Sequence, residues 1–147
     1  MIALAKKAQP AAIAVLRQAT AFKPKRIKAS DGLLPSAAHQ KQNPNSDHNS
    51  GFAVDLSHDP VNGFDCADVY EQLKHDNRVK YLIFHGKIWS LKNGDDVYTG
   101  SNQHNHHLHI SIKPECGSDT SNWFAWMGEV PKIKVLSSIK PLPKKKP

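Results

Sequence analysis

Two clusters of histidine and aspartate in this sequence have residue types that could hold a metal ion. The first is residues 46–55 (SDHNSGFAVD), and the second is residues 104–109 (HNHHLH). Together they contain five of the nine histidines of the chain. A catalytic zinc ion takes three protein ligands and keeps one position open for water. Two neutral imidazoles and one carboxylate drawn from these clusters would meet that need, and the bound ion would lower the pKa of its water towards ~7.

The second cluster leads into a segment that alternates like a β-strand. Side chains on a strand point to opposite faces in turn, so His107 and His109 share one face. Leu108, Ile110 and Ile112 then point into a core. One histidine on the metal and another beside it is a useful arrangement for a hydrolase, because the second can donate a hydrogen bond to the oxyanion that forms on the attacked carbonyl.

Each of these residues also has an ordinary interpretation. A single strand histidine is more often a surface or satisfied core residue, and Asp55 alone could belong to a turn or a cap. A run such as HNHHLH could bind metal without catalysing anything. These ordinary interpretations explain the residues singly better than they explain all of them together, because the first cluster also has glycine and alanine where a strand would have to pass close to a metal.

The first cluster matches a known pattern, Ser-x-His-x-x-Gly-x-Ala-x-Asp. Its fixed positions are Ser46, His48, Gly51, Ala53 and Asp55. This resembles the signature of the D-alanyl-D-alanine carboxypeptidase and phage L-alanyl-D-glutamate endopeptidase family, and His107-Leu108-His109 resembles its later His-x-His. The resemblance, which spans residues 30–113, implies a zinc site with His48, Asp55 and His109 as ligands and His107 lining the active site.

The sequence departs from the family pattern at two positions. Many members place an acidic general base three residues before the final zinc ligand, where this chain has His106. Some members of the wider superfamily have His-x-x-His-x-His instead, which His104, His107 and His109 match. The base is therefore expected to be His106 or His104, since histidine titrates near neutral pH.

The second departure is an arginine that many members carry upstream of the first motif. Residues 29–32 (ASDG) stand about where that arginine would fall. Lys28, His39 or Lys41 could take its place, and the sequence leaves the choice open.

The resemblance implies a zinc metallopeptidase that hydrolyses the peptide stems of bacterial peptidoglycan, in the manner of a phage endolysin. The bond between L-alanine and D-glutamate is the expected target. Two alternatives are a D-Ala-D-Ala-type carboxypeptidase and a catalytically inactive zinc-bearing module that binds the wall. A nucleic-acid binder is disfavoured, because the basic residues lie near the termini without interleaved aromatic residues.

Length and charge agree with such a protein. The 147 residues favour one domain, expected over residues 1–135, followed by a flexible, basic, proline-rich tail over residues 136–147. The net charge of +7 suits anionic wall polymers, which the tail would contact. We expect a monomer without a membrane span. The N-terminus lacks the features of a signal peptide, so we expect synthesis in the host cytoplasm and action on the cell wall.

The elements that must position the clusters can be predicted from pattern. A helix is expected over residues 10–22 with Ile13, Leu16 and Ala19 or Thr20 on one side, a long loop over 23–50, and a strand over 51–56. Asp65 should cap a helix that ends near residue 74. Strands over 79–85 and 88–91 should form a hairpin, followed by a strand over 106–112 and a short helix within 121–128. These elements predict an α+β fold, with helices packed on a small antiparallel sheet and zinc in a cleft on its open face. Cys66 and Cys116 are too few for a disulfide framework, although one bridge is conceivable.

Overall fold

A computed structural model describes residues 8–35, 40–41, 45–100 and 102–131, and it has the predicted α+β architecture. The helices are α1 (Pro10–Phe22) and α3 (Cys66–Leu73). The strands are β1 (Ala53–Ser57), β2 (Val79–Phe84), β3 (Lys87–Ser90), β4 (Gly94–Val97) and β5 (His107–Ile112). Short 3-10 helices are η1 (Asp47–Ser50), η2 (Pro60–Asn62), η3 (Pro114–Cys116) and η4 (Ala125–Met127). The expected tail over residues 136–147 lies outside the described residues.

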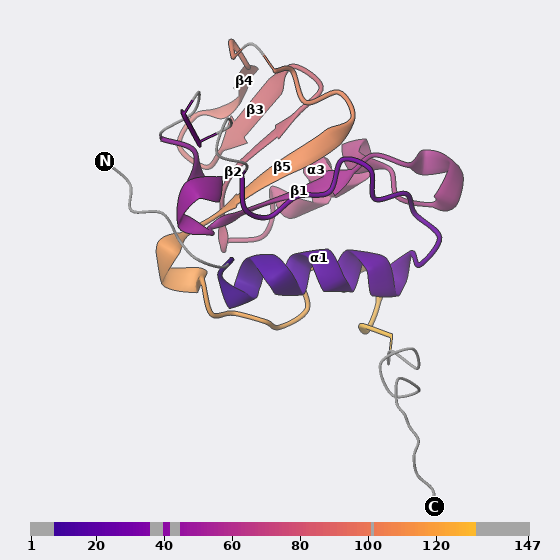
Figure 1. The fold of residues 1–147 in the computed structure, drawn as a ribbon. Coiled ribbons are helices and arrows are strands. Elements are labelled where there is room, and N and C mark those ends of the chain that lie inside the picture. The colour runs from indigo at the N-terminus through magenta and orange to yellow at the C-terminus, as the bar shows by residue number, and fades with distance from the viewer. Residues whose placement is uncertain (1–7, 36–39, 42–44, 101, 132–147) are drawn as a thin grey trace, which may run out of the picture.

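The five strands form one antiparallel sheet in the order β1-β5-β2-β3-β4 (Figure 1). The hairpin of β2 and β3 is confirmed. β5, the last strand in the sequence, lies between β1 and β2. Strand β4 was not predicted, because its residues, Gly94 to Val97, are mostly polar and follow a turn signal at Asn93-Gly94.

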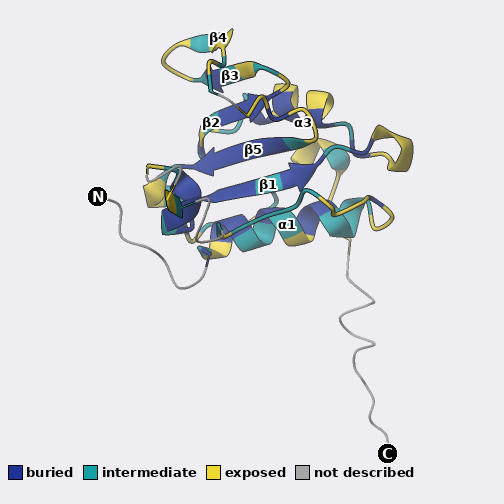
Figure 2. Ribbon diagram, turned by 45° about the horizontal axis from the view of Figure 1, so that its top comes forward, coloured by how far each residue is buried: buried dark blue, intermediate teal, exposed yellow. Residues whose placement is uncertain are grey.

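The two faces of the sheet differ in what covers them. Helix α1 packs against β1, and α3 packs against β2 and β5 (Figures 1 and 2). One hydrophobic core joins both helices to the face that carries Leu56, Leu108 and Ile110, which are fully buried. The opposite face carries Asp55 and His109, because successive strand residues alternate between faces.

Helix α1 begins at the predicted proline, but its buried face differs in part from the expected one. Pro10 occupies the first turn, where its missing N–H costs nothing. The buried positions include Ala11, Val15 and Ala19, whereas Ile13 and Leu16 are only partly buried beside the core. Of the side predicted from the spacing, Ala19 is fully buried, whereas Ile13 and Leu16 lie at the flanks of the buried face.

Helix α3 follows its prediction closely. The carboxylate of Asp65 accepts a hydrogen bond from the backbone N–H of Ala67 at 2.9 Å, as an N-cap does, and Val69 and Leu73 are buried. The short helix predicted within residues 121–128 is only the 3-10 turn η4. Trp123 is buried, and Trp126 is 37 % exposed with its ring 5.5 Å from that of Phe124.

Two further expectations concern the whole chain. Cys66 and Cys116 are free thiols and form no bridge with each other. None of the helices within the described ranges has the length and apolar character needed to cross a membrane.

Candidate metal centre

The face of the sheet opposite the hydrophobic core brings the three predicted ligands together. Asp55 on β1 pairs in register with His109 on β5, so their side chains stand side by side on one face. His48 reaches the pair from η1, with its ring centroid 4.9 Å from that of His109. One ligand atom from each of the three residues lies within 4.8 Å of the others. The resulting group combines two ring nitrogens with one carboxylate.

Local sequence explains how His48 enters the site. Ser46 caps η1, and its hydroxyl accepts a hydrogen bond from the backbone N–H of His48 at 3.2 Å. Gly51 ends the turn at φ 82°, a conformation that favours glycine, and the chain then enters β1. Ala53, the first residue of β1, is fully buried. Each fixed position of the first motif therefore has a structural role around the site.

A hydrogen bond to the backbone fixes the orientation of His48. Its Nδ1 lies 2.7 Å from the carbonyl oxygen of Leu33, which can only accept, so Nδ1 carries the proton. The other ring nitrogen, Nε2, lies 3.1 Å from Oδ1 of Asp55. Two lone pairs would face each other there unless a proton or a metal ion lies between them. A metal-binding histidine usually has its other ring nitrogen held by a hydrogen bond, as Nδ1 of His48 is held by the carbonyl oxygen of Leu33.

The same carboxylate oxygen also faces His109. The distance from Nδ1 of His109 to Oδ1 of Asp55 is 3.3 Å. Metal–ligand bonds of ~2.0–2.1 Å in a tetrahedron place ligand atoms about 3.3 Å apart, which is close to these two separations, and all three ligand atoms lie within 4.8 Å of one another. Two imidazoles and a carboxylate could therefore hold a metal ion.

The segment carrying Leu33 is held against the outer edge of β1. Gly32 exchanges two backbone hydrogen bonds with Asp55, at 2.8 and 3.1 Å. The buried guanidinium of Arg26 donates to both carboxylate oxygens of Asp31, at 2.9 and 2.8 Å. Asp31 also accepts from the backbone N–H of Ser57 at 2.8 Å. The ion pair thus fixes the loop that supplies the acceptor for His48.

Electrostatics favour an ionised carboxylate at the centre of the group. Burial opposes ionisation of Asp55, but hydrogen bonds from His109 and His48 outweigh burial and hold the pKa of Asp55 well below its ordinary value. Burial also opposes protonation of His48, yet the hydrogen bond and charge of Asp55 raise the pKa of His48 overall. The site therefore attracts positive charge, whether as protons or as a metal ion.

His107 and His104 border the three ligands. His107 lies on the same face of β5, with Nε2 3.7 Å from Oδ2 of Asp55. The ring of His104 is buried, 4.8 Å from that of His107 and 5.7 Å from that of His109. His104 has a φ of 58°, an unusual conformation for a residue other than glycine and one that recurs at functional sites.

The state of His104 follows from its contacts. Its Nδ1 donates to the carbonyl oxygen of Asn102 at 2.7 Å, which leaves Nε2 with a lone pair. Burial and the neighbouring His109 and His107 lower the pKa of His104 to about 4. Burial likewise lowers the pKa of His107. His106 is exposed, and its backbone carbonyl accepts from the N–H of His58 at 2.9 Å.

Two of the three candidates for the missing upstream arginine lie in the described residues, and both are exposed. Nζ of Lys28 donates to the carbonyl oxygen of Arg26 at 3.2 Å, and Lys41 is exposed as well. His39 lies outside the described residues. Arg26, the nearest arginine before the motif, is paired with Asp31.

Sequence reasoning missed the residues behind His109. Nε2 of His109 lies 2.7 Å from the hydroxyl of Ser111, and the ring of Tyr81 stacks on the imidazole at 5.4 Å. Strand alternation could have found Ser111, which stands two residues after His109. Tyr81 could not be found in this way, because the pairing of β2 with β5 is not visible in the sequence.

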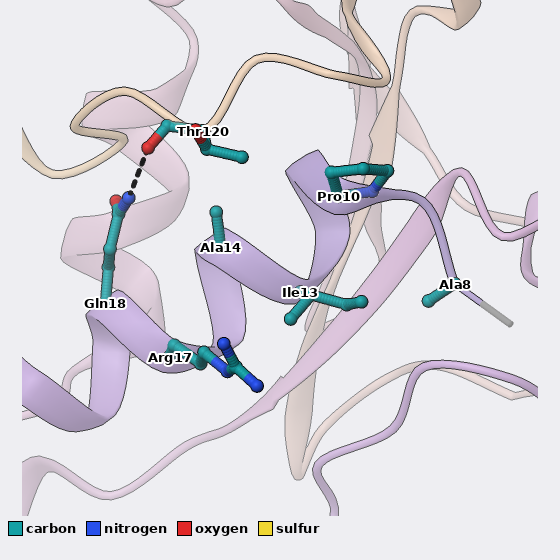
Figure 3. Close-up of a pocket in the computed structure, with 7 residues that line it drawn as sticks. All are labelled: Ala8, Pro10, Ile13, Ala14, Arg17, Gln18 and Thr120. Atoms are coloured by element: carbon teal, nitrogen blue, oxygen red, sulfur yellow. Dashed lines mark hydrogen bonds between the residues drawn. The ribbon is translucent and has the colours of Figure 1, made fainter. Parts of the chain in front are cut away.

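A separate hollow lies beside α1 (Figure 3). Its lining residues are Ala8, Pro10, Ile13, Ala14, Arg17, Gln18 and Thr120. The only charged group among them is that of Arg17, so this hollow offers no ligand set for a metal. Comparison of the chain with protein-family models, curated proteins and solved structures finds no match.

Proposed function

We propose that this chain is a zinc-dependent peptidase that cleaves the peptide stems of bacterial peptidoglycan, with the L-alanyl-D-glutamate bond as its target. The observation that carries the proposal is the grouping of His48, Asp55 and His109 on one face of the sheet, beside two further histidines. The motif resemblance supplies the substrate class, and the geometry supports a hydrolytic site.

Each residue of the proposed site has a separate role in hydrolysis. A zinc ion held by the group would polarise the scissile carbonyl and make water a stronger nucleophile. His104, whose Nδ1 is committed to Asn102, accepts the proton of the attacking water at Nε2 and passes it to the leaving amine. His107 donates a hydrogen bond to the oxygen of the attacked carbonyl. His106 is the second candidate for the base, although it is exposed.

The choice of bond follows from what wall lysis requires. Cleavage next to the glycan releases the whole stem with every cross-link on it, whereas removal of a terminal D-alanine leaves cross-links intact. Anionic wall polymers remain candidate partners of the basic tail.

Digestion of purified peptidoglycan by the zinc-loaded protein tests the proposal, with the new termini identified by mass spectrometry. New N-terminal D-glutamate is expected, and an Asp55→Asn variant should release none. Release of D-alanine alone would instead identify a D-Ala-D-Ala-type carboxypeptidase. A protein that binds zinc and wall material but releases no peptide would be an inactive wall-binding module, an alternative favoured by the histidine at the usual acidic base position.

A further inference from the structure

A line of hydrogen-bonding side chains extends from His109 away from the ligand group. Nδ1 of His109 faces Asp55, so Nε2 must carry the ring proton whenever Nδ1 binds a metal. An N–H buried in this way needs an acceptor. The hydroxyl oxygen of Ser111 stands 2.7 Å from Nε2 and provides one.

Ser111 can act as that acceptor because its own proton has another destination. Ser111 is fully buried, and it pairs in register with Tyr81 on β2. Ser111 acts on the Tyr81 phenol as a donor does and Asp47 as an acceptor does, the first lowering and the second raising the pKa of Tyr81. A carboxylate only accepts, so the phenol proton is directed to Asp47 and the phenol oxygen is left for the proton of Ser111. Every hydroxyl in the line then donates in one direction.

The line ends on a charged acceptor. The carboxylate of Asp47 is buried beside Nζ of Lys80, at 3.1 and 3.2 Å, so its charge is balanced. Asp47 begins η1 and directly precedes His48 in the chain. The line thus starts at one metal-binding histidine and returns to the turn that carries the other.

Tyr81 also restrains the plane of the imidazole. Its ring lies 5.4 Å from that of His109, at an interplanar angle of 14°. Stacking on one side and a hydrogen bond in the ring plane together leave His109 little freedom to tilt or flip. Such outer contacts commonly determine how tightly a metal is held.

We propose that Ser111, Tyr81 and Asp47 are positioning residues that hold His109 with its Nε2 proton directed away from the ligand group, and that they thereby set the affinity of the site for zinc. This inference rests on the proposed metal site and adds the residues that tune it. None of the three touches the metal position.

The test measures zinc affinity by competition with a chromophoric chelator in the full chain. Ser111→Ala should bind zinc about 10- to 100-fold more weakly, the usual effect of losing an outer-shell partner. Tyr81→Phe keeps the stacked ring and should weaken binding by a smaller factor. Ser57→Ala is the matched control: Ser57 is also a fully buried serine of this sheet, but its hydroxyl accepts from the backbone N–H of Ser30 at 2.9 Å.

A spectroscopic measurement separates positioning from general damage to the fold. In the zinc-loaded wild type, the Nε2 proton of His109 should give a ring N–H resonance protected from exchange with water. That resonance should be lost or exchange rapidly in Ser111→Ala and persist in Ser57→Ala.

The outcomes are distinct. Wild-type affinity in both Ser111→Ala and Tyr81→Phe would overturn the inference and leave the metal site standing. Equal weakening in Ser57→Ala and Ser111→Ala would also overturn it, since the effect would then be a general cost of losing a buried serine. A wild-type chain that binds no zinc would overturn the metal site itself, and this inference with it.

Discussion

Asp55 on β1 lies directly opposite His109 on β5, with its Oδ1 3.3 Å from the imidazole Nδ1. The same oxygen lies 3.1 Å from Nε2 of His48. One carboxylate oxygen therefore faces two ring nitrogens, and each contact needs a proton or a metal ion between the nitrogen and the oxygen. This relationship makes the three residues a specific ligand group rather than a loose cluster of polar side chains.

The first prediction concerns metal content. The purified protein should contain about one zinc per chain, because the three ligands define one site. Asp55→Asn and His48→Ala should each lose the metal, and the exposed His75 offers a control in His75→Ala. Elemental analysis of dialysed protein measures the outcome. Full zinc content in both ligand variants would contradict the assignment.

The second prediction separates the base from the ligands. His104→Ala and His106→Ala should retain zinc, and one of them should lower peptide release by about 100-fold, the usual size of a general-base effect. Buried His104, with its free Nε2, is expected to be the sensitive position. Peptide release from peptidoglycan is compared between the wild type and the two variants at equal zinc content. Full activity in both variants would place the base elsewhere. The carboxylates of Asp31 and Asp47 are the remaining candidates, but they already pair with Arg26 and Lys80.

The third prediction concerns acid stability of the metal-free protein. The pKa of His104 is lowered from 6.5 to about 4, so between these values the unfolded chain binds a proton that the folded chain does not. The contribution of His104 to stability should therefore be lost as pH falls through this range. His104→Gln does not titrate and should lose less stability between pH 7 and 5, by about 1 kcal/mol. The difference is measured from the urea unfolding midpoints of the wild type and His104→Gln at several pH values, with a chelator present. Parallel pH profiles of the two proteins would contradict the prediction.

The fourth prediction concerns the buried ion pair that fixes the loop before η1. Arg26→Met leaves the largely buried carboxylate of Asp31 without its partner and should lower the free energy of unfolding by about 3–5 kcal/mol. Lys28→Met, at an exposed position, should change it by less than about 0.5 kcal/mol. Denaturant unfolding compares the two. Similar stabilities would show that the pair does not hold this segment.

Much of the fold was predictable because its local signals agree. Pro10 marks the start of α1, Asp65 caps α3, and the apolar run of residues 79–84 forms β2. The buried face of α1 was found only in part, because it consists largely of alanines, which carry little hydrophobic signal. Strand β4 was missed because Asp95 and Asp96 interrupt any apolar pattern.

The candidate site was predictable where one segment supplies it. The spacing of His48 and Asp55, and the alternation of His107 and His109, were both visible along the chain. The acceptor for His48 is a backbone carbonyl, that of Leu33, which no sequence pattern encodes. The position of Arg26 was equally hidden, since its pairing with Asp31 depends on how the loop folds against β1.

The place of β5 in the sheet has a consequence for how the protein is made. β5 is the last strand to be synthesised among those in the described residues, yet it separates β1 from β2, so these two strands cannot be joined in the sheet before it arrives. A growing chain that ends before β5 carries His48 and Asp55 but lacks the third residue of the group. Under the proposed function, metal capture and completion of the sheet would be one event, and the bound ion would stabilise the strand pairing that is most costly in loop-closure entropy.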